Sequence, residues 1–391
     1  MLEKLHIRGY KSIQDMELQL RPLNILIGAN GAGKSNFISL FRFLTAIVDR
    51  QLQLTTAQNG GPDLILHYGR RVTSQISVEL LWDSSNEYRC SLVPTLENSL
   101  AIGEERALYH ANGRDFLLGT GLLESRLLAG PNEGPVTAFV LERMKSYRHY
   151  HFHDTSAAAK VKQLGDVHDS LFLQPDGGNL AAFLYMLRGP YRPAYDKIVQ
   201  AVRLAAPFFD DFVLEPQHQN PNFIALVWRE AGTGAIWGPH ALSDGTLRFM
   251  CLACLLLQPD LFMPETILLD EPELGLHPYA LQLLASLLSQ ASARRQIIAA
   301  TQSVPLVDHF APEDMVVVDR VDNQSLFRRL DVEAISEWLK GYTLGQLWQK
   351  NVLGGRPHGI SYPEKEAPNG PSVPELPRAI EMPDWDAGRQ G

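Results

Sequence analysis

The segment from Gly28 to Ser35 has the residue types that cradle a chain of phosphates. Its sequence, GANGAGKS, fits the pattern GxxxxGK followed by Ser or Thr, and it lies between an apolar strand-like run and a stretch with helical spacing. The glycines let successive backbone N–H groups face phosphate oxygens, and the helix N-terminus adds partial positive charge. We expect Lys34 to reach the β- and γ-phosphates and Ser35 to bind Mg²⁺. The expected nucleotide contacts in this segment are Asn30, Gly31, Gly33, Lys34, Ser35 and Asn36.

An acidic pair, Asp270 and Glu271, ends the apolar run ILLD and offers the second half of this chemistry. Asp270 would hold Mg²⁺ directly or through water, and Glu271 would polarise an attacking water. The alternative is an acidic pair at the start of a helix, where the helix dipole favours negative charge. Because a complete phosphate loop precedes the pair in the chain, we interpret it as part of a nucleotide site.

A polar turn, SDGT from Ser243 to Thr246, precedes a helix that is apolar on nearly every side. A phosphate loop grips a nucleotide from one side, so the far face of the γ-phosphate stays wet and loses electrostatic help. Ser243 and Gly245 could cover that face with a hydroxyl and a backbone N–H. The buried helix behind them cannot swing onto its own loop, which predicts a head-to-tail homodimer around two ATP molecules. The alternative is that Ser243 is only an N-cap.

The elements that must position these residues follow from hydrophobic spacing. Strands are predicted at 2–9, 16–27, 145–153, 265–270, 296–303 and 314–319, and helices at 35–48, 180–188, 191–204, 246–257 and from Pro278 onward. From residue 73 the period changes to two, which predicts antiparallel hairpins, one of them turning at Asn112-Gly113. Residues 51–63 are predicted to be loop. The alternation of strand and helix in the last third implies parallel crossovers.

The composition is that of a globular, soluble protein, with 391 residues, 45% of them hydrophobic and 20% charged. No apolar run of about 18 residues and no signal-like N-terminus occurs, so we expect a cytoplasmic protein with no membrane partner. Three cysteines form no disulfide framework, and the pair Cys251 and Cys254 is expected in the core. The net charge of −9 argues against a generally basic nucleic-acid surface but leaves room for a local basic groove.

The motifs GANGAGKS, LSDGT, ILLDEP, ELGLHP and ATQS, in that order, resemble those of ABC-type ATPases of the SMC/RecF/OLD-like branch. More narrowly, the chain resembles the small bacterial AAA-type proteins of the AAA_21 group, also in LHIRGYKSIQ near its start and YTLGQLWQKNVLGGRP near its end. The resemblance covers roughly 1–50, 145–190 and 236–357. It implies ATP and Mg²⁺ as cofactors, ATP-driven dimerisation, slow hydrolysis in trans, and coupling to DNA or to a partner effector.

Two motifs depart from the family pattern. ABC transporters carry LSGGQ, whereas this chain has Asp244 and Thr246 in the turn, so Ser243 and Gly245 are its best-supported contacts. The switch position, usually a histidine, is Gln302, which can hydrogen-bond a γ-phosphate but cannot carry a proton's charge. We therefore expect Glu271 and Gln302 to be the catalytic residues of an enzyme with slow turnover.

Several positions keep two interpretations. The equivalent of the Q-loop could be His153 or Asp154 in YHFHD, or this stretch is a surface loop at a strand end. Lys11 could reach a phosphate, as basic residues there do in relatives, or it is simply solvated. The alternating histidines of RHYHFHD could suggest a metal site, but no further ligand lies at a suitable spacing. His277 is interpreted as a dimer-seam residue or an N-cap.

These patterns predict an α/β P-loop NTPase of ABC/RecF type, with a mixed sheet, an antiparallel β layer and a helical lid insertion. The predicted parts are 1–160, an ATPase lobe with the phosphate loop and the β layer; 161–236, the helical lid; 237–353, an ATPase lobe with signature, acidic pair and switch strand; and 354–391, a proline-rich tail.

Three functions compete. The leading hypothesis is a hydrolysing ATPase switch in phage defence or DNA maintenance, working with DNA or with a nuclease-like effector that is a separate polypeptide. The second is the nucleotide-binding subunit of a transporter, which the long separation of Ser35 from Ser243 disfavours. The third is a non-hydrolysing, ATP-dependent scaffold, which is favoured by Gln302 at the switch position and by the altered signature.

Overall fold

Two six-stranded sheets organise the part of the chain that the computed structural model describes, residues 1–128 and 134–355. The first sheet is antiparallel, in the order β2-β1-β4-β5-β6-β7. Its strands are β1 (Leu2–Tyr10), β2 (Ile13–Gln19), β4 (Ile76–Trp82), β5 (Asn86–Pro94), β6 (Leu100–Tyr109) and β7 (Arg114–Leu122). Side chains of β4 alternate between buried and partly exposed, the pattern of a sheet with one covered face.

The second sheet is mixed, in the order β17-β16-β3-β15-β14-β8. Its strands are β3 (Leu23–Ile27), β8 (Tyr147–Tyr150), β14 (Thr266–Asp270), β15 (Gln296–Thr301), β16 (Met315–Val321) and β17 (Gln324–Arg329). All neighbours pair in parallel except β16 and β17. The strands at its centre are buried on both faces, which explains why they are continuous apolar runs rather than alternating ones.

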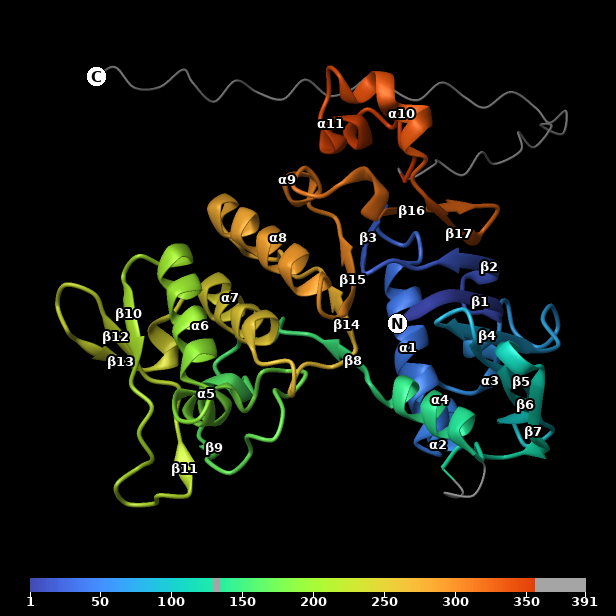
Figure 1. Ribbon diagram of the computed structural model, residues 1–391, viewed down its shortest axis with the longest axis horizontal. Helices are drawn as coiled ribbons and strands as arrows, with labels where there is room; N and C mark the ends of the chain where they lie inside the picture. Colours follow the sequence, from blue (N-terminus) through green and yellow to red (C-terminus); the bar gives the residue numbers. More distant parts are fainter. Residues whose placement is uncertain (129–133, 356–391) are drawn as a thin grey trace, which may run out of the picture. The chain divides into compact units, whose positions relative to one another are not determined.

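Helices cover both faces of the mixed sheet (Figure 1). Helix α1 (Lys34–Val48) lies between the two sheets and shares one core with both. On the other face, α7 (Asp244–Leu257) and α8 (Pro278–Ser292) share a second core with α5 (Leu180–Arg188) and α6 (Arg192–Ala205). Cys251 and Cys254 are buried in this second core, as predicted, and burial raises the pKa of Cys251 to about 12.

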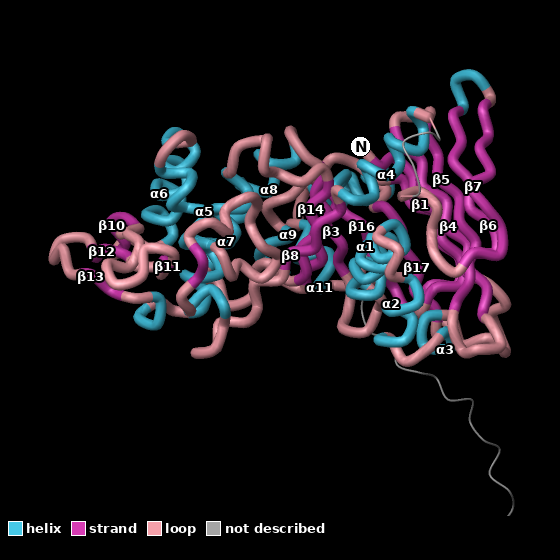
Figure 2. The backbone as a smooth tube through the Cα atoms, turned by 90° about the horizontal axis from the view of Figure 1, so that it is seen from below, coloured by secondary structure: helices cyan, strands magenta, loops and turns pink. Residues whose placement is uncertain are grey.

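Shorter elements complete the described residues, as the tube in Figure 2 shows. The helices are α2 (Leu52–Gln58), α3 (Pro62–Ile65), α4 (Pro135–Lys145), α9 (Val304–Val307), α10 (Val332–Leu339) and α11 (Leu344–Gln349). The strands are β9 (Gly165–Asp166), β10 (Phe209–Phe212), β11 (Phe223–Ile224), β12 (Trp228–Glu230) and β13 (Ile236–Trp237). Single 3-10 turns occur at His110–Asn112, Lys160–Lys162, Pro239–Ala241 and Pro312–Asp314.

Residues 16–27 form two strands in different sheets, so the prediction of one strand was wrong. β2 alternates in burial within the antiparallel sheet, whereas β3 is buried throughout in the mixed sheet. The chain turns between them, where Arg21 N donates to Asn24 Oδ1 at 3.0 Å and Asn24 Nδ2 donates back to Arg21 O at 2.6 Å. The sequence signal for this change of sheet was Pro22, which lies in the middle of the run.

Residues 51–63 are mainly helical, which corrects the predicted loop. The N-terminus of α2 is capped from a distance, because the carboxylate of Glu124 accepts hydrogen bonds from Leu52 N at 2.9 Å and Gln53 N at 3.1 Å. A partner so far along the sequence leaves no local signal. The strands predicted at 145–153 and 296–303 are shorter, as β8 and β15.

The predicted helical lid, 161–236, is only partly helical. It contains α5 and α6, but short strands β9 to β13 make up two further small sheets beside them. The proline-rich tail predicted at 354–391 lies almost wholly outside the described residues. Within the described residues, no helix is long and apolar enough to cross a membrane.

Candidate nucleotide-binding site

The phosphate loop connects β3 to α1 in a left-handed backbone conformation that glycine adopts without strain. Gly33 has φ of 120°, and a Cβ there would lie 2.1 Å from Ser325 Oγ. At Gly31, with φ of 77°, a Cβ would meet nothing within 4 Å. Packing therefore requires glycine at position 33, whereas Gly31 borders open space.

Lys34 is buried, with 5% of its surface exposed, and its ammonium is folded onto its own loop. Its Nζ donates to the carbonyl oxygens of Gly28 at 2.6 Å and Ala29 at 3.0 Å. Burial lowers the pKa of Lys34, while the negative charges of Glu271, Asp270 and Glu273 oppose that shift. The lysine thus lies close enough to the carboxylates that follow β14 for their charges to affect its pKa.

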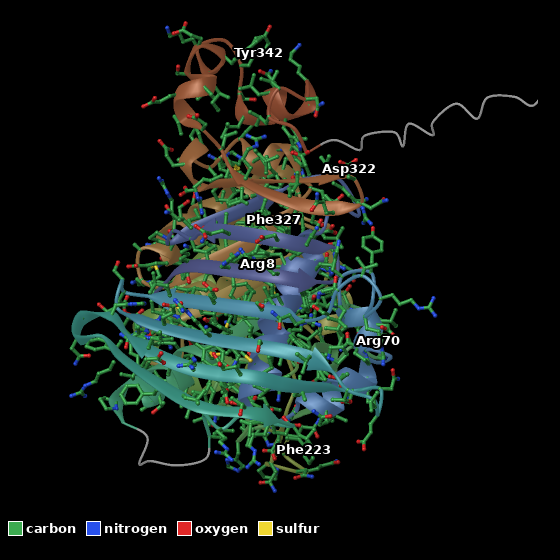
Figure 3. The ribbon with its side chains drawn as sticks, turned by 90° about the vertical axis from the view of Figure 1, so that its right-hand side faces the viewer. Arg8, Arg70, Phe223, Asp322, Phe327 and Tyr342 are labelled. Carbon is green, nitrogen blue, oxygen red and sulfur yellow. The ribbon has the colours of Figure 1, made fainter. Side chains whose placement is uncertain are left out.

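Two serines that the sequence reasoning missed support the loop from behind. Ser325, at the start of β17, donates from Oγ to the carbonyl of Ala32 at 2.5 Å, and its Oγ lies 2.7 Å from Ser12 Oγ, whose hydroxyl can donate to it. Asn36, predicted to contact the nucleotide, donates from Nδ2 to Ser12 Oγ at 2.7 Å. Figure 3 shows β17, with Phe327, beside the first antiparallel strands, with Arg8, so the two sheets meet next to this support.

The predicted magnesium ligands remain available to a cation. The side chain of Ser35 is exposed and has no hydrogen-bond partner among the described residues. Asp270 is the last residue of β14 and is partly exposed. Since β15 alone separates β14 from β3, the carboxyl ends that carry Asp270 and the phosphate loop meet at one edge of the sheet. A hydroxyl and a carboxylate are the oxygen donors that Mg²⁺ prefers, so the residues fit Mg²⁺ with a triphosphate.

The structure brings together Glu271 and Gln302, which are far apart in the sequence. Gln302 Nε2 donates to Glu271 Oε1, and the backbone of Glu271, with φ of 46°, is held by a 2.8 Å bond from its N to Ala300 O. A positive φ at a residue other than glycine is uncommon and marks a constrained position. The general-base candidate is thus presented by a fixed turn.

Glu273 belongs to this cluster, although the sequence reasoning did not select it. Its Oε1 accepts hydrogen bonds from Thr301 Oγ1 and from Gln302 N, the latter at 3.1 Å, so it fixes the end of β15. Burial raises the pKa of the Glu273 carboxyl, and its Oε2 is buried without a partner among the described residues. The repeated acid in DEPE was the available signal.

The segment after β8 approaches the acidic edge through His153 rather than Asp154. His153 Nε2 lies 3.3 Å from the carbonyl oxygen of Glu271, to which its N–H can donate, whereas Asp154 is exposed and accepts from Ser156 N at 3.1 Å. Arg42 Nε donates to His149 Nδ1 at 3.0 Å, and burial lowers the pKa of His149 to about 3. No cluster suited to hold a metal ion occurs in the described parts of the chain.

The turn from Ser243 to Thr246 makes no hydrogen bond to the phosphate loop within the described residues. Ser243 is the N-cap of α7, and its Oγ accepts from Thr246 N at 3.2 Å. A Cβ at Gly245 would lie 2.1 Å from the carbonyl oxygen of Gly275, so packing within one chain also requires this glycine. Asp244 forms a 3.7 Å ion pair with Lys162.

Two other predicted positions have clear places. Lys11 Nζ donates to Ser39 Oγ at 3.1 Å on α1, one turn beyond Ser35, so it lies on the helix that follows the phosphate loop. His277 is the N-cap of α8, where its Nδ1 accepts from Tyr279 N at 3.3 Å. The N-cap interpretation of His277 is therefore confirmed.

Two sequence families match this chain. Residues 124–308 match the family described as "AAA domain, putative AbiEii toxin, Type IV TA system" (AAA_21), and residues 1–88 match "AAA ATPase domain" (AAA_15). Among curated proteins, no significant match in sequence was found.

Two solved structures are similar to the chain over most of its length. One is an SMC head bound to the C-winged helix domain of ScpA, with a TM-score of 0.54 and 16% identity over 85% of this chain and 98% of that one. The other, derived from *Pyrococcus furiosus*, is an SMC head with an extended coiled coil bound to the C-terminal domain of ScpA, with a TM-score of 0.52 and 14% identity over 87% and 98%. At such identities the similarity shows the fold. The shared fold is that of the SMC head, and the two family models match separate parts of the chain.

Proposed function

We propose that this chain binds ATP with Mg²⁺ and hydrolyses it slowly, as a head-to-tail dimer that encloses two nucleotides. The observation that carries the proposal is the convergence at one sheet edge of Lys34, Glu271 and Gln302, which follow the strands β3, β14 and β15. Each of the three residue types is suited to a step of phosphoryl transfer to water.

The roles follow from the positions of the groups. Lys34 would leave the carbonyls of its own loop for the β- and γ-phosphates, an exchange of neutral acceptors for charged ones. Ser35 and Asp270 would hold Mg²⁺, which when bound neutralises charge that develops on the phosphates. Glu271 would orient and activate the attacking water from its constrained turn.

The dimer is proposed because Ser243 is exposed and is bonded only within its own turn among the described residues. An N-cap hydroxyl and backbone N–H groups at the start of α7 are suited to bind an anion. A second copy would bring them to the open side of the first copy's nucleotide. Water would then be excluded from both sites at once.

A non-hydrolysing scaffold is the second candidate, and the contact between Gln302 and Glu271 favours it. In the described state, the amide occupies an oxygen that a general base needs for water. Hydrolysis requires Gln302 to turn toward the γ-phosphate and release this oxygen. If it does not, ATP binding would close the dimer without turnover.

The output of the switch is proposed to be DNA binding or control of a separate, nuclease-like effector, in the cytoplasm, in phage defence or DNA maintenance. The matching family's description names a putative toxin of a type IV toxin–antitoxin system, which is in line with defence. The similar SMC heads are bound to a domain of ScpA, so this fold supports partner binding. Salt-dependent binding of double-stranded DNA ends, with a non-hydrolysable ATP analogue present, would test the DNA branch.

The proposal is tested by phosphate release from the full chain with ATP, with and without EDTA. We expect slow release that requires Mg²⁺ and disappears in Lys34→Ala and Glu271→Gln. Unchanged release in both variants would show that the site is elsewhere. ATP binding without release in the wild-type protein, together with ATP-dependent dimers, would favour the scaffold.

A further inference from the structure

Arg248, on the first turns of α7, hydrogen-bonds two other segments of the molecule. Its Nε donates to the carbonyl of Phe152 at 3.2 Å and its Nη2 to that of His153 at 2.9 Å. Its Nη1 donates to the carbonyl of Leu274 at 2.8 Å. The guanidinium therefore ties the helix behind the Ser243 turn to the segment after β8 and to the loop after β14.

The surrounding backbone is shaped around this side chain. Gly275 has φ of 77°, and a Cβ there would come within 2.9 Å of Arg248 Nη1. The same glycine's carbonyl oxygen abuts Gly245, where a Cβ would lie 2.1 Å away. Any larger residue at either position would push the turn, the loop and the guanidinium apart. Two glycines and one arginine thus form a close contact between the Ser243 turn and the loop that follows Glu271.

The contacts continue from Arg248 to the general-base candidate. His153, whose carbonyl accepts from Arg248, has its ring 3.3 Å from the carbonyl oxygen of Glu271. Leu274 N donates to that same residue's carbonyl at 3.2 Å. Both segments held by the guanidinium therefore contact the carbonyl oxygen of Glu271. A displacement of α7 would be transmitted to Glu271 through the Arg248 side chain, and from there through the His153 ring and the turn from Glu271 to Leu274.

We propose that Arg248 is a positioning residue that couples the two ATP sites of a dimer. This inference rests on the proposed function, in which the Ser243 turn binds the nucleotide of the partner. Closure of that turn on the partner's γ-phosphate shifts α7, and Arg248 carries the shift to Glu271 of the same chain. Hydrolysis in one site then depends on occupancy of the other.

Arginine is suited to this role, since its planar fork can satisfy carbonyls on separate segments at once. Lysine could reach one of these carbonyls with a compact ammonium but would not bridge them all. Arg248→Lys should therefore restore folding and part of the activity without the full coupling. Arg248→Ala removes every bridge.

Arg295 provides a matched control for a purely structural role of Arg248. Arg295 also donates to three carbonyl oxygens, of Met263 at 3.2 Å, Arg294 at 3.0 Å and Asp260 at 2.8 Å, and these residues belong to no part of the proposed site. Arg295→Ala therefore loses a similar set of bonds. Any effect common to both variants reflects stability alone.

The experiment measures hydrolysis by the full chain as a function of ATP concentration, with binding of a fluorescent ATP analogue and the dimer fraction measured in parallel. For the wild-type protein and Arg295→Ala we expect cooperative hydrolysis, with a Hill coefficient that approaches the number of sites in a dimer. For Arg248→Ala we expect a Hill coefficient near one and kcat lower by about tenfold or more, with nucleotide affinity changed less than about twofold. Arg248→Lys should lie between.

The outcomes separate the two proposals. Cooperative hydrolysis that persists in Arg248→Ala, or that is lost equally in Arg295→Ala, would overturn the coupling role and leave the dimeric ATPase intact. A wild-type protein that hydrolyses ATP as a monomer without cooperativity would overturn the coupling role and the dimer together. Loss confined to Arg248 variants supports the inference.

Discussion

The edge of the mixed sheet and the Ser243 turn differ in how far one chain completes them. At the sheet edge, residues that follow three different strands interact: Gln302 donates a hydrogen bond to Glu271, and the nearby carboxylates act on the charge of Lys34. At the turn, two motif residues have a role within the chain, Ser243 as a helix cap and Gly245 in close packing. A motif can thus serve folding and still leave exposed the hydroxyl of Ser243, which the proposed dimer would use.

The largest expected effect is at the completed region, in Glu271→Gln. The amide cannot take a proton from water, so turnover should fall by about 10²- to 10⁴-fold while ATP binding is kept. Phosphate release and nucleotide binding measured on the same sample would show this separation. Glu142→Gln, on the exposed side of α4, is the control and should behave as wild type. Equal turnover in the two variants would mean that Glu271 is not the base.

Lys34→Ala should weaken ATP binding itself, by about 100-fold, because a charge-assisted contact to the phosphates is lost in a water-poor site. The measurement is equilibrium binding of ATP at fixed Mg²⁺. The same change leaves the carbonyls of Gly28 and Ala29 without their lysine donor, at a cost of about 1–3 kcal/mol, so urea denaturation is used to check that the variant is folded. Retained affinity in a folded variant would remove Lys34 from the site.

Gly245→Ala tests how tightly the Ser243 turn packs against the loop that follows Glu271. The new methyl group would overlap the carbonyl of Gly275, and overpacking of this kind costs about 1–3 kcal/mol of unfolding free energy. Gly232→Ala provides a contrast, since no atom lies within 4 Å of a Cβ there, although its φ of 82° adds some strain. Urea denaturation of both variants compares the two costs. A Gly245 variant as stable as wild type would show that the loop after Glu271 gives way easily.

The smallest expected effect is a pH dependence of the unfolding free energy that comes from His149 on β8. The pKa of His149 is lowered to about 3 in the folded chain, against about 6.5 when unfolded. Below pH ~6.5 the unfolded chain gains a proton that the folded chain does not take up, so unfolding free energy falls as pH falls toward 3. Denaturation at pH 7 and pH 5 should show a smaller decline in His149→Gln than in wild type. The exposed His309→Gln should leave the decline unchanged.

The sequence predicted the sheet edge well where a motif is contiguous and local. The motif from Gly28 to Ser35 predicts a strand before it and a helix after it, and β3 and α1 occupy these places. Asp270 ends its strand as expected. The sequence could not reveal contacts between polar residues that belong to no motif and lie far apart in the chain. Two examples are the contact of Ser325 with Ser12 and that of Arg248 with Leu274. Serine and arginine are common on any protein surface, so their residue types do not identify these partners before the chain folds.

Errors in the predicted elements have similar causes. The turn at Arg21 and Pro22 divides the predicted strand between two sheets, and hydrophobic spacing does not record which sheet a strand joins. Helix α2 was missed because Glu124 caps it from the far end of the antiparallel sheet. The predicted lid contains small sheets whose strands are too short to show a period.

The central claim is that one chain cannot enclose its own triphosphate and uses the Ser243 turn of a second copy. It is tested most directly by the mass in solution of Glu271→Gln with ATP and Mg²⁺, compared with the same protein carrying Ser243→Ala, by light scattering at micromolar concentration. Thr343→Ala, which removes another N-cap, controls for a stability loss of about 1 kcal/mol. We predict a dimer for Glu271→Gln alone and with Thr343→Ala, and a monomer with Ser243→Ala. An ATP-loaded Glu271→Gln protein that stays monomeric, or a dimer that is indifferent to Ser243, would contradict the claim.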